Sequence, residues 1–349
     1  MFSALRTRAG SGRRPTGRTL RPVLAAGIGI LLISCTPAPS VHKDTAYVPA
    51  APARAGANGR VYVTNQQDNT LSVIDAGTYK VVATVPAGVA PEGVAVAKDG
   101  KHVYIANSGS ARVSVLDTRN NKIVKTVTVG KSPTGVGLSP DGRSLYVTNG
   151  SSNTVSVIDT RTNRVAATIP VGKSPVNVAF SPDGRTAYVA NSGSGNLSVI
   201  DTSTHRVARK LSAGHSPVGV AITPDGKSAY VADEVGTRVL AVGTGTRKVT
   251  PVQVGEGPFD VAVAPDGHHA YSANLGPGSV SVIDIPNNRV SANIAVGPVG
   301  TDPFNLEVTN EAIYVTNQGA GTLAVIDPHS RKVVATVTLG ASPYGVAVS

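Results

Sequence analysis

The sequence predicts an all-β protein, a seven-bladed β-propeller of four-stranded antiparallel blades. A four-residue marker, Tyr-Val-Thr-Asn or a near copy, recurs seven times at intervals of 41–43 residues, and the chain contains 38 Gly and 24 Pro without a helical apolar period. An interval in the low forties is the length of one blade, and Gly and Pro mark turns between short strands. The seven markers end at Asn65, Asn107, Asn149, Asn191, Asp233, Asn274 and Asn317.

The repeat that begins at Pro133 shows four strands in order. Residues 133–139 form the first strand, and Pro140-Asp141-Gly142 after it is typical of a type I turn. Residues 145–149 form the second strand, the alternating apolar residues of 155–159 predict the third, and 165–169 form the fourth. A Gly-x-x-Pro link then leads into the next repeat.

The two ends of the repeat region complement each other. The first repeat starts at Val61 with a second strand, and the chain ends with a first strand at residues 345–349. We therefore expect blade 1 to combine 345–349 with 61–85, so that pairing between the C-terminal strand and the N-terminal blade closes the ring and removes exposed sheet edges.

On these markers, residues 61–349 resemble the YVTN-type β-propeller repeat family. The resemblance implies the fold and little about activity, because propellers serve as binding proteins, scaffolds and enzymes. The residues that recur in every blade are expected to be structural. Turn-bracing carboxylates are predicted at the end of each third strand, at Asp75, Asp117, Asp159, Asp201, Asp284 and Asp327.

Residues 1–34 predict a lipoprotein signal peptide. Six arginines and no acid precede a short apolar run at 23–33, and Leu32-Ile33-Ser34-Cys35 resembles the bacterial lipobox, which implies lipidation of Cys35. An ordinary secretory signal and twin-arginine export at Arg13-Arg14 are the alternatives. We expect residues 35–60, rich in Ala and Pro, to tether the propeller to the outer face of the cell membrane, within the cell envelope.

Charge and cysteine content limit the function classes. The net charge of +11 falls to +5 without the six signal arginines, and Cys35 is the only Cys, so disulfides and thiol chemistry are not expected in the propeller. Basic residues such as Arg119, Lys122, Arg164 and Arg206 follow the predicted outer rim. Binding of nucleic acid or another anionic polymer there is an alternative, although no aromatic residues are interleaved with the charges.

The candidate site lies where the repeats differ. The residue after the linking Pro is aromatic in three consecutive blades, and polar or acidic residues fall beside it or, like Glu307, at a position where the other blades have Ala or Gly. Basic residues occupy the links opposite. We expect a polarised, ligand-binding mouth formed by Phe259, Asp260, Phe304, Asn305, Tyr344, Glu307, Glu92, Lys131, Lys173 and His215. The alternative is that the aromatics pack the channel and the charges are solvated.

Catalytic motifs do not stand out. The seven His have no zinc spacing, and neither a nucleophile elbow nor a phosphate-binding Gly loop occurs in a suitable context. We therefore expect a monomeric, non-catalytic binding or scaffold protein for an envelope protein, glycan or small ligand, without a cofactor. The alternative is a metal-dependent hydrolase similar to lactonase-type propellers, with a divalent cation at the axis held by Asp260, Asn305 and Glu307.

Overall fold

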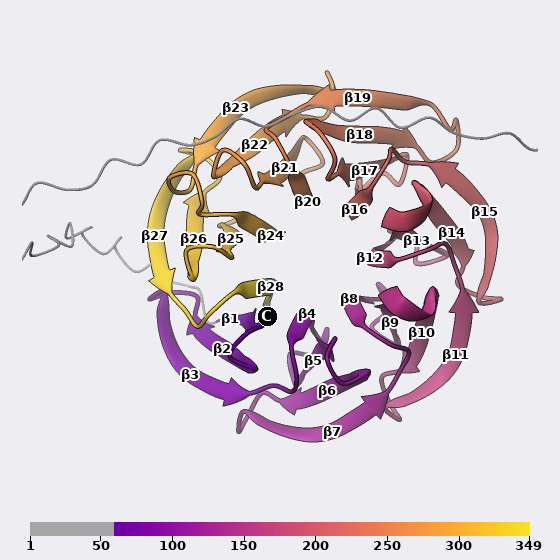
Figure 1. Ribbon diagram of the computed structural model, residues 1–349, viewed down its shortest axis with the longest axis vertical. Helices are drawn as coiled ribbons and strands as arrows, with labels where there is room; N and C mark the ends of the chain where they lie inside the picture. The colour runs from indigo at the N-terminus through magenta and orange to yellow at the C-terminus, as the bar shows by residue number, and fades with distance from the viewer. Residues whose placement is uncertain (1–58) are drawn as a thin grey trace, which may run out of the picture. The chain divides into compact units, whose positions relative to one another are not determined.

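The computed structural model describes residues 59–349, which form seven four-stranded antiparallel sheets arranged as blades around a central axis (Figure 1). This architecture confirms the predicted seven-bladed, all-β propeller. The predicted signal peptide, Cys35 and nearly all of the predicted tether lie outside the described residues. Within residues 59–349, no helix has the length and apolar character needed to cross a membrane.

Each blade runs from an inner strand A to an outer strand D. Blades 1 to 3 consist of β28 (Pro343–Val348), β1 (Arg60–Asn65), β2 (Thr70–Asp75), β3 (Lys80–Pro86); β4 (Pro91–Val96), β5 (His102–Asn107), β6 (Arg112–Asp117), β7 (Lys122–Thr128); and β8 (Pro133–Leu138), β9 (Ser144–Asn149), β10 (Thr154–Asp159), β11 (Arg164–Pro170). Blades 4 and 5 consist of β12 (Pro175–Phe180), β13 (Thr186–Asn191), β14 (Asn196–Asp201), β15 (Arg206–Ser212); and β16 (Pro217–Ile222), β17 (Ser228–Asp233), β18 (Arg238–Gly243), β19 (Val249–Gln253). Blades 6 and 7 consist of β20 (Pro258–Val263), β21 (His269–Asn274), β22 (Ser279–Asp284), β23 (Arg289–Ala295); and β24 (Pro303–Val308), β25 (Ile313–Asn317), β26 (Thr322–Asp327), β27 (Lys332–Thr338).

The ring closes in blade 1, as predicted. The C-terminal strand β28 pairs antiparallel with β1, placing Val348 opposite Val61 and Val346 opposite Val63. The Ser349 backbone N–H also donates to the Arg60 carbonyl over 2.9 Å. The strands extend slightly beyond the predicted bounds, since β1 begins at Arg60 and β28 at Pro343. Closure supplies hydrogen-bond partners for two strand edges that an open ring would expose.

The hydrophobic core lies between neighbouring blades. Strands B and C are almost fully buried, whereas most residues of an outer strand such as β7 are exposed. One cluster, for example, joins Leu71 and Val73 of blade 1 to Val103 and Leu116 of blade 2. Each fully buried side chain of this size contributes about 1.5–3 kcal/mol, so the contacts between blades stabilise the ring as a whole.

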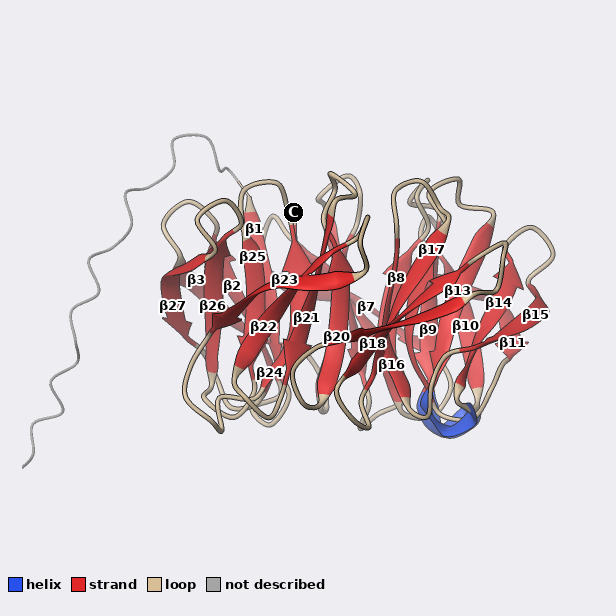
Figure 2. Ribbon diagram, turned by 90° about the horizontal axis from the view of Figure 1, so that it is seen from above, coloured by secondary structure: helices blue, strands red, loops and turns tan. Residues whose placement is uncertain are grey.

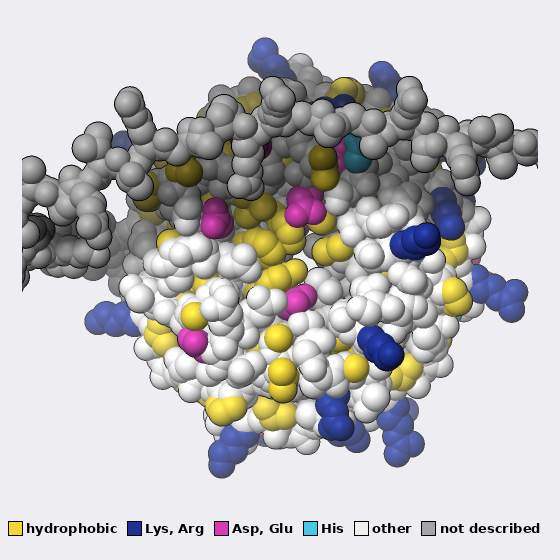
Figure 3. All heavy atoms as spheres, in the orientation of Figure 1, with side chains coloured by type: hydrophobic (Ala, Val, Ile, Leu, Met, Phe, Trp, Pro, Cys, Tyr) yellow, Lys and Arg dark blue, Asp and Glu magenta, His cyan; other side chains and the backbone are white. Residues whose placement is uncertain are grey.

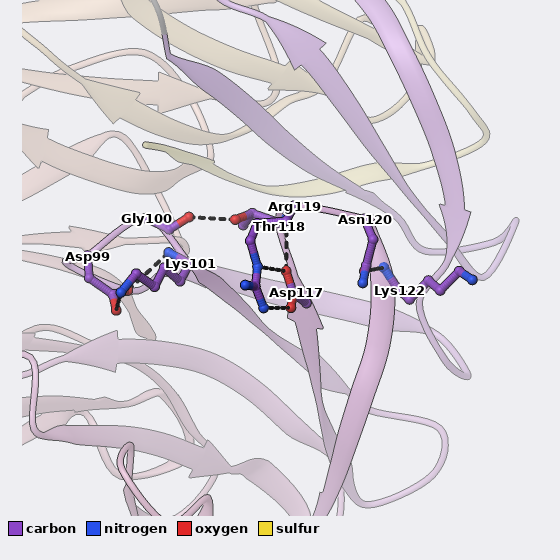
Figure 4. Close-up of polar contacts among 8 residues, drawn as sticks. All are labelled: Asp99, Gly100, Lys101, Asp117, Thr118, Arg119, Asn120 and Lys122. Carbon is purple, nitrogen blue, oxygen red and sulfur yellow. Dashed lines mark hydrogen bonds and ion pairs between the residues drawn. The ribbon is translucent and has the colours of Figure 1, made fainter.

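The turn aspartates brace their turns. In blade 2 the Asp117 carboxylate accepts the Arg119 backbone N–H over 2.9 Å and pairs with the Arg119 guanidinium (Figure 4). These bonds lower the pKa of Asp117 to about 2. The Thr118 hydroxyl donates to the Gly100 carbonyl over 2.7 Å, which ties the C–D turn to the A–B turn. The structural role predicted for the repeated Asp residues is therefore confirmed here.

The loops divide between two faces. The B–C loops and the D–A links share one face, which we call the link face; the backbone N–H of Gly150 in a B–C loop, for instance, donates to Ser132 in a link. Two B–C loops contain short 3-10 helices that the sequence did not predict, η1 (Gly150–Ser152) and η2 (Ser192–Ser194), and Figure 2 shows both on the same side of the disc. The A–B and C–D turns occupy the opposite face.

Candidate functional site

A cavity of about 350 Å³ lies at the centre of the ring, lined by residues of all seven inner strands. Figure 3 views the disc from the link face. Hydrophobic side chains border the central opening, acidic side chains lie around it, and Lys and Arg lie farther out. The cavity is therefore the place where residues that differ between blades can meet one ligand.

The three predicted aromatic residues contact one another. The rings of Phe259 and Phe304 stack with centroids 3.7 Å apart, and the rings of Phe304 and Tyr344 meet edge-on at 4.5 Å. Phe304 is only 8% exposed and is held between its neighbours. Phe259 and Tyr344 line the cavity and Phe304 does not, so Phe304 supports the two rings rather than forming the wall itself.

Asp260 and Asn305 form a hydrogen-bonded chain across three blades. The Asp260 carboxylate accepts the Asn305 side-chain amide over 2.7 Å and the Leu306 backbone N–H over 3.2 Å. The Asn305 side-chain oxygen in turn accepts the Val346 backbone N–H over 3.2 Å. These bonds satisfy backbone groups of inner strands that have no neighbouring strand on that side.

The position of Asp260 and Asn305 is Gly in four other blades. A Cβ at Gly345 would lie 2.6 Å from the Glu92 carbonyl oxygen, so the close approach of two inner strands requires glycine there. Asp260 is buried, and this burial raises its pKa to about 7 despite the hydrogen bonds that it accepts.

Glu307 is also a cavity residue. It pairs with Tyr314 in the register of the blade, the same place that Ala347 occupies opposite Tyr62. Burial raises the pKa of Glu307 to about 7, and the neighbouring Asp260 carboxylate adds to the effect. Two carboxyl groups in one desolvated cavity hold protons near neutral pH, and so are prepared for a change of charge when a ligand binds.

Glu92 lies beside the aromatic residues, but it does not line the cavity. Its carboxylate accepts the Gln66 side-chain amide over 2.9 Å. Burial raises the pKa of Glu92, whereas hydrogen bonds from Ser108, Gln66 and other neighbours oppose the rise. Burial and the nearby Glu92 raise the pKa of Tyr344 well above its usual value. Glu92 therefore extends the acidic side of the opening.

The predicted basic residues lie farther out. Lys131, Lys173 and His215 are exposed in their links and are absent from the cavity lining. The backbone N–H groups of Lys131 and Lys173 donate to serine hydroxyls of the B–C loops, and the His215 ring lies 3.6 Å from Asp233. The structure thus brings the aromatic and acidic residues together and leaves the basic ones at the rim of the link face.

The threonines of the marker position the neighbouring blade, a role that the repeat pattern did not reveal. The Thr316 hydroxyl donates to the Tyr344 carbonyl over 2.7 Å, and the Thr148 hydroxyl donates to the Val176 carbonyl over 2.8 Å. The Thr64 hydroxyl reaches the Glu92 carbonyl in the same way. Each bond fixes the mouth residue of the next blade. The sequence does distinguish these blades, because only these three of the seven markers carry Thr as their third residue.

The link between blades 6 and 7, residues 297–303, is longer than the Gly-x-x-Pro links of the other blades. Thr301 is buried within it and donates its hydroxyl to the Pro298 carbonyl over 2.6 Å, whereas Val299 is 83% exposed. An apolar side chain so exposed on the link face adds contact surface close to the aromatic blades.

The residues predicted as metal ligands do not form an evident metal site. Across residues 59–349, no group of three or more His, Cys, Asp or Glu side chains is arranged to hold an ion. Asp260 and the Asn305 side-chain oxygen already accept hydrogen bonds within the protein. Glu307 remains the acidic side chain most available to a ligand in the cavity.

A family model described as YNCE-like beta-propeller matches residues 39–140 and 137–228. No curated protein matches the sequence.

Three solved structures are similar. The hydrazine synthase of Kuenenia stuttgartiensis has a TM-score of 0.68 and 23% identity, covering 74% of this chain and 89% of that chain. A functionally unknown protein of Desulfotomaculum acetoxidans DSM 771 has a TM-score of 0.69 and 19% identity, covering 83% of this chain and 98% of that one. The dihydro-heme d1 dehydrogenase NirN, in complex with DHE, has a TM-score of 0.61 and 18% identity, and the match covers 83% of this chain and 64% of that chain. At these identities the likeness shows the shared fold alone.

Proposed function

The chain belongs to the YNCE-like β-propeller family, and from the geometry of its channel we propose that it is a non-catalytic binding protein, tethered to the cell envelope through Cys35, that takes a ligand into the mouth of the channel on the link face. The observation that supports it best is the contact of three aromatic residues beside a cavity of about 350 Å³. Apolar walls with a few convergent polar groups are the usual composition of ligand sites.

The rigidity of the fold supports the same proposal. The Phe259 ring is fixed by its stacking on Phe304, and the Tyr344 backbone is held by the Thr316 hydroxyl. A site built on strands of a closed ring loses little conformational freedom when a ligand binds.

The test is a ligand screen by thermal shift on the wild-type chain and on variants of the mouth. A ligand present at about 100 times its dissociation constant stabilises the fold by about 2.7 kcal/mol, which is readily measured. Stabilisation should be lost in Phe259→Ala and reduced in Phe304→Leu, which keeps an apolar side chain in the stack. Phe180→Leu is the matched control, because Phe180 packs on Tyr146 away from the aromatic mouth. Equal stabilisation of all four proteins would contradict the proposal.

A metal-dependent hydrolase is the second candidate, and the observation that favours it is the pair of carboxyl groups, Asp260 and Glu307, at the cavity. A chelator and a panel of divalent cations distinguish the two. A thermal shift produced by one cation and lost in Glu307→Gln would support the hydrolase. We place it second because the Asp260 carboxylate and the Asn305 amide are already engaged with each other.

A further inference from the structure

The charges that line the cavity are all of one sign. Asp260 and Glu307 are the only ionisable carboxyl groups among its lining residues, and Lys, Arg and His are absent from the described residues that form its wall. A buried carboxylate ordinarily has a cationic or hydrogen-bonding partner, because removal of a charge from water is costly. The cavity therefore offers acidic groups to a ligand and no cationic side chain that would compete for them.

Glu307 is the more available of the two acids. No hydrogen bond or ion pair of residues 59–349 engages its carboxyl group, whereas Asp260 is held by Asn305 and Leu306. Packing of the blade does not require an acid at this place, since the six other blades have Ala or Gly there. A carboxyl group that serves neither packing nor an internal bond is available to a ligand.

The wall beside these acids is aromatic. Phe259 and Tyr344 line the same cavity, and Tyr344 is close enough to Asp260 for that carboxylate to raise its pKa, after burial and Glu92. Aromatic rings attract organic cations through their electron-rich faces, by about 0.5–2 kcal/mol for each contact. Carboxylates and aromatic rings together favour a ligand that is both positively charged and partly apolar.

We propose that the cavity binds a small organic cation, an alkylammonium or arylammonium group, which pairs with Glu307 and contacts Phe259 and Tyr344. This proposal rests on the binding function proposed above. A cavity of about 350 Å³ is at the small end of ligand sites. A divalent metal fits less well, because it requires several free oxygen ligands and the Asp260 and Asn305 groups are already bonded to each other. An anion would meet two carboxyl groups and no positive partner.

Binding should be linked to protonation. The titratable groups that face the ligand are Glu307 on β24, Asp260 on β20, Tyr344 on β28 and, beside the opening, Glu92 on β4; β8, β12 and β16 contribute neutral residues to the wall. Burial raises the pKa of Glu307 and Asp260 to about 7. A bound cation favours the ionised carboxylates, so the affinity should fall as the pH is lowered from 8 to 5.

The experiment is calorimetric titration of the full chain with matched probes. Benzylammonium and choline are the cations, benzyl alcohol and 3,3-dimethylbutan-1-ol are their neutral isosteres, and benzoate is the anion. We expect binding of at least one cation at pH 8 and at least tenfold weaker binding at pH 5. Near pH 7, where the two carboxyl groups are partly protonated, binding should release protons, which is measured by comparing buffers of different ionisation enthalpy. Neither the neutral isosteres nor benzoate should bind measurably.

Two substitutions place the cation at Glu307. Glu307→Gln and Glu307→Ala should both weaken binding of the cation at least tenfold. The alanine variant introduces the residue that five of the six other inner strands carry at this position, Ala347 among them. Glu256→Gln, which removes an exposed acid from a link on the same face, should leave binding unchanged.

The outcomes separate this inference from the function on which it rests. Binding of neutral or anionic probes that is lost in Phe259→Ala would overturn the cation and leave the binding function standing. Cation binding that is unchanged in both Glu307 variants, or absent at pH 8, would overturn the inference outright, while the ligand screen continues to test the mouth. A shift with divalent cations alone would favour the hydrolase.

Discussion

Asn305 donates its side-chain amide to the Asp260 carboxylate over 2.7 Å, and this bond joins the inner strands of blades 6 and 7. The same asparagine accepts the Val346 backbone N–H of blade 1 over 3.2 Å. The Asn305 side chain thus joins blade 7 to both of its neighbours, blades 6 and 1. Phe259 and Phe304 directly precede Asp260 and Asn305 in sequence, and Tyr344 lies two residues before Val346, so the hydrogen bonds and the ring contacts involve the same short stretch of each inner strand.

Asn305→Ala should destabilise the protein by about 1–3 kcal/mol, because it leaves the buried Asp260 carboxyl group and the Val346 N–H with fewer partners. Equilibrium unfolding in urea measures the loss. Asn177→Ala is the matched control, since the Asn177 side-chain oxygen accepts only the N–H of its own neighbour, Val178. An equal loss in both variants would mean that the bond between blades contributes nothing of its own.

Stability should fall as the pH rises from about 5 to about 8. Burial raises the pKa of Asp260 and Glu307 to about 7 in the folded protein, whereas carboxyl groups of the unfolded chain titrate near 4. The unfolded chain therefore releases these protons first. The stabilisation is complete below about pH 4 and is lost as the pH passes through about 7.

Thermal unfolding at pH 5 and at pH 8 tests this dependence in wild type and Glu307→Ala. The variant should be more stable than wild type at pH 8, by about 1–3 kcal/mol, and should show a smaller difference between the two pH values. The aspartates with lowered pKa, such as Asp117, titrate well below this window and do not interfere. A Glu307→Ala profile parallel to that of wild type would disprove the role of Glu307.

The fold could be predicted because each blade repeats the same local signals. Seven markers set the number of blades, and the missing first strand at Val61 required a partner at the C-terminus. The 3-10 helices of blades 3 and 4 were not predictable from periodicity, since they are single turns of Gly and Ser that end at left-handed residues, Asn153 and Gly195.

The site could be predicted in part. Equivalent positions of a symmetric ring lie at the same height, so aromatic residues after three consecutive linking prolines had to come close together. Their division of roles was not predictable, because the burial of Phe304 between Phe259 and Tyr344 depends on ring orientation. The basic residues Lys131 and Lys173 lie in exposed links, where they were expected, and the sequence alone did not show that these side chains stay outside the cavity lining.

Deletion of residues 343–349 should abolish cooperative folding of the full chain. It removes β28, the inner strand of blade 1, and exposes β1 and the apolar side chains that pack on Val346 and Ala347. Size-exclusion chromatography and circular dichroism should show aggregation or loss of the unfolding transition. Addition of a synthetic 343–349 peptide is the control, and restored folding would show that the strand itself is what is missing.

Blade 5 contains a paired departure from the repeat. Asp233 stands where six blades have Asn, and its carboxylate accepts the backbone N–H groups of His215 and Ser216 over 3.0 and 2.8 Å. The Arg238 guanidinium lies 3.7 Å away. Arg238 and Leu240 replace the two side chains that would accept an asparagine amide, so the acid is matched to its surroundings.

Asp233→Asn should therefore destabilise the protein by about 1–3 kcal/mol, because the new amide N–H groups face Leu240 and lack the acceptors that Thr154 and Ser156 give to Asn149. Leu240→Ser alone should also destabilise, through lost apolar burial. Together the two substitutions recreate the polar contact of blade 3, and a double-mutant cycle in urea should give a favourable coupling of at least about 1 kcal/mol. Strictly additive losses would show that Asp233 and Leu240 are independent, and that the neighbouring Arg238 alone accounts for the acid.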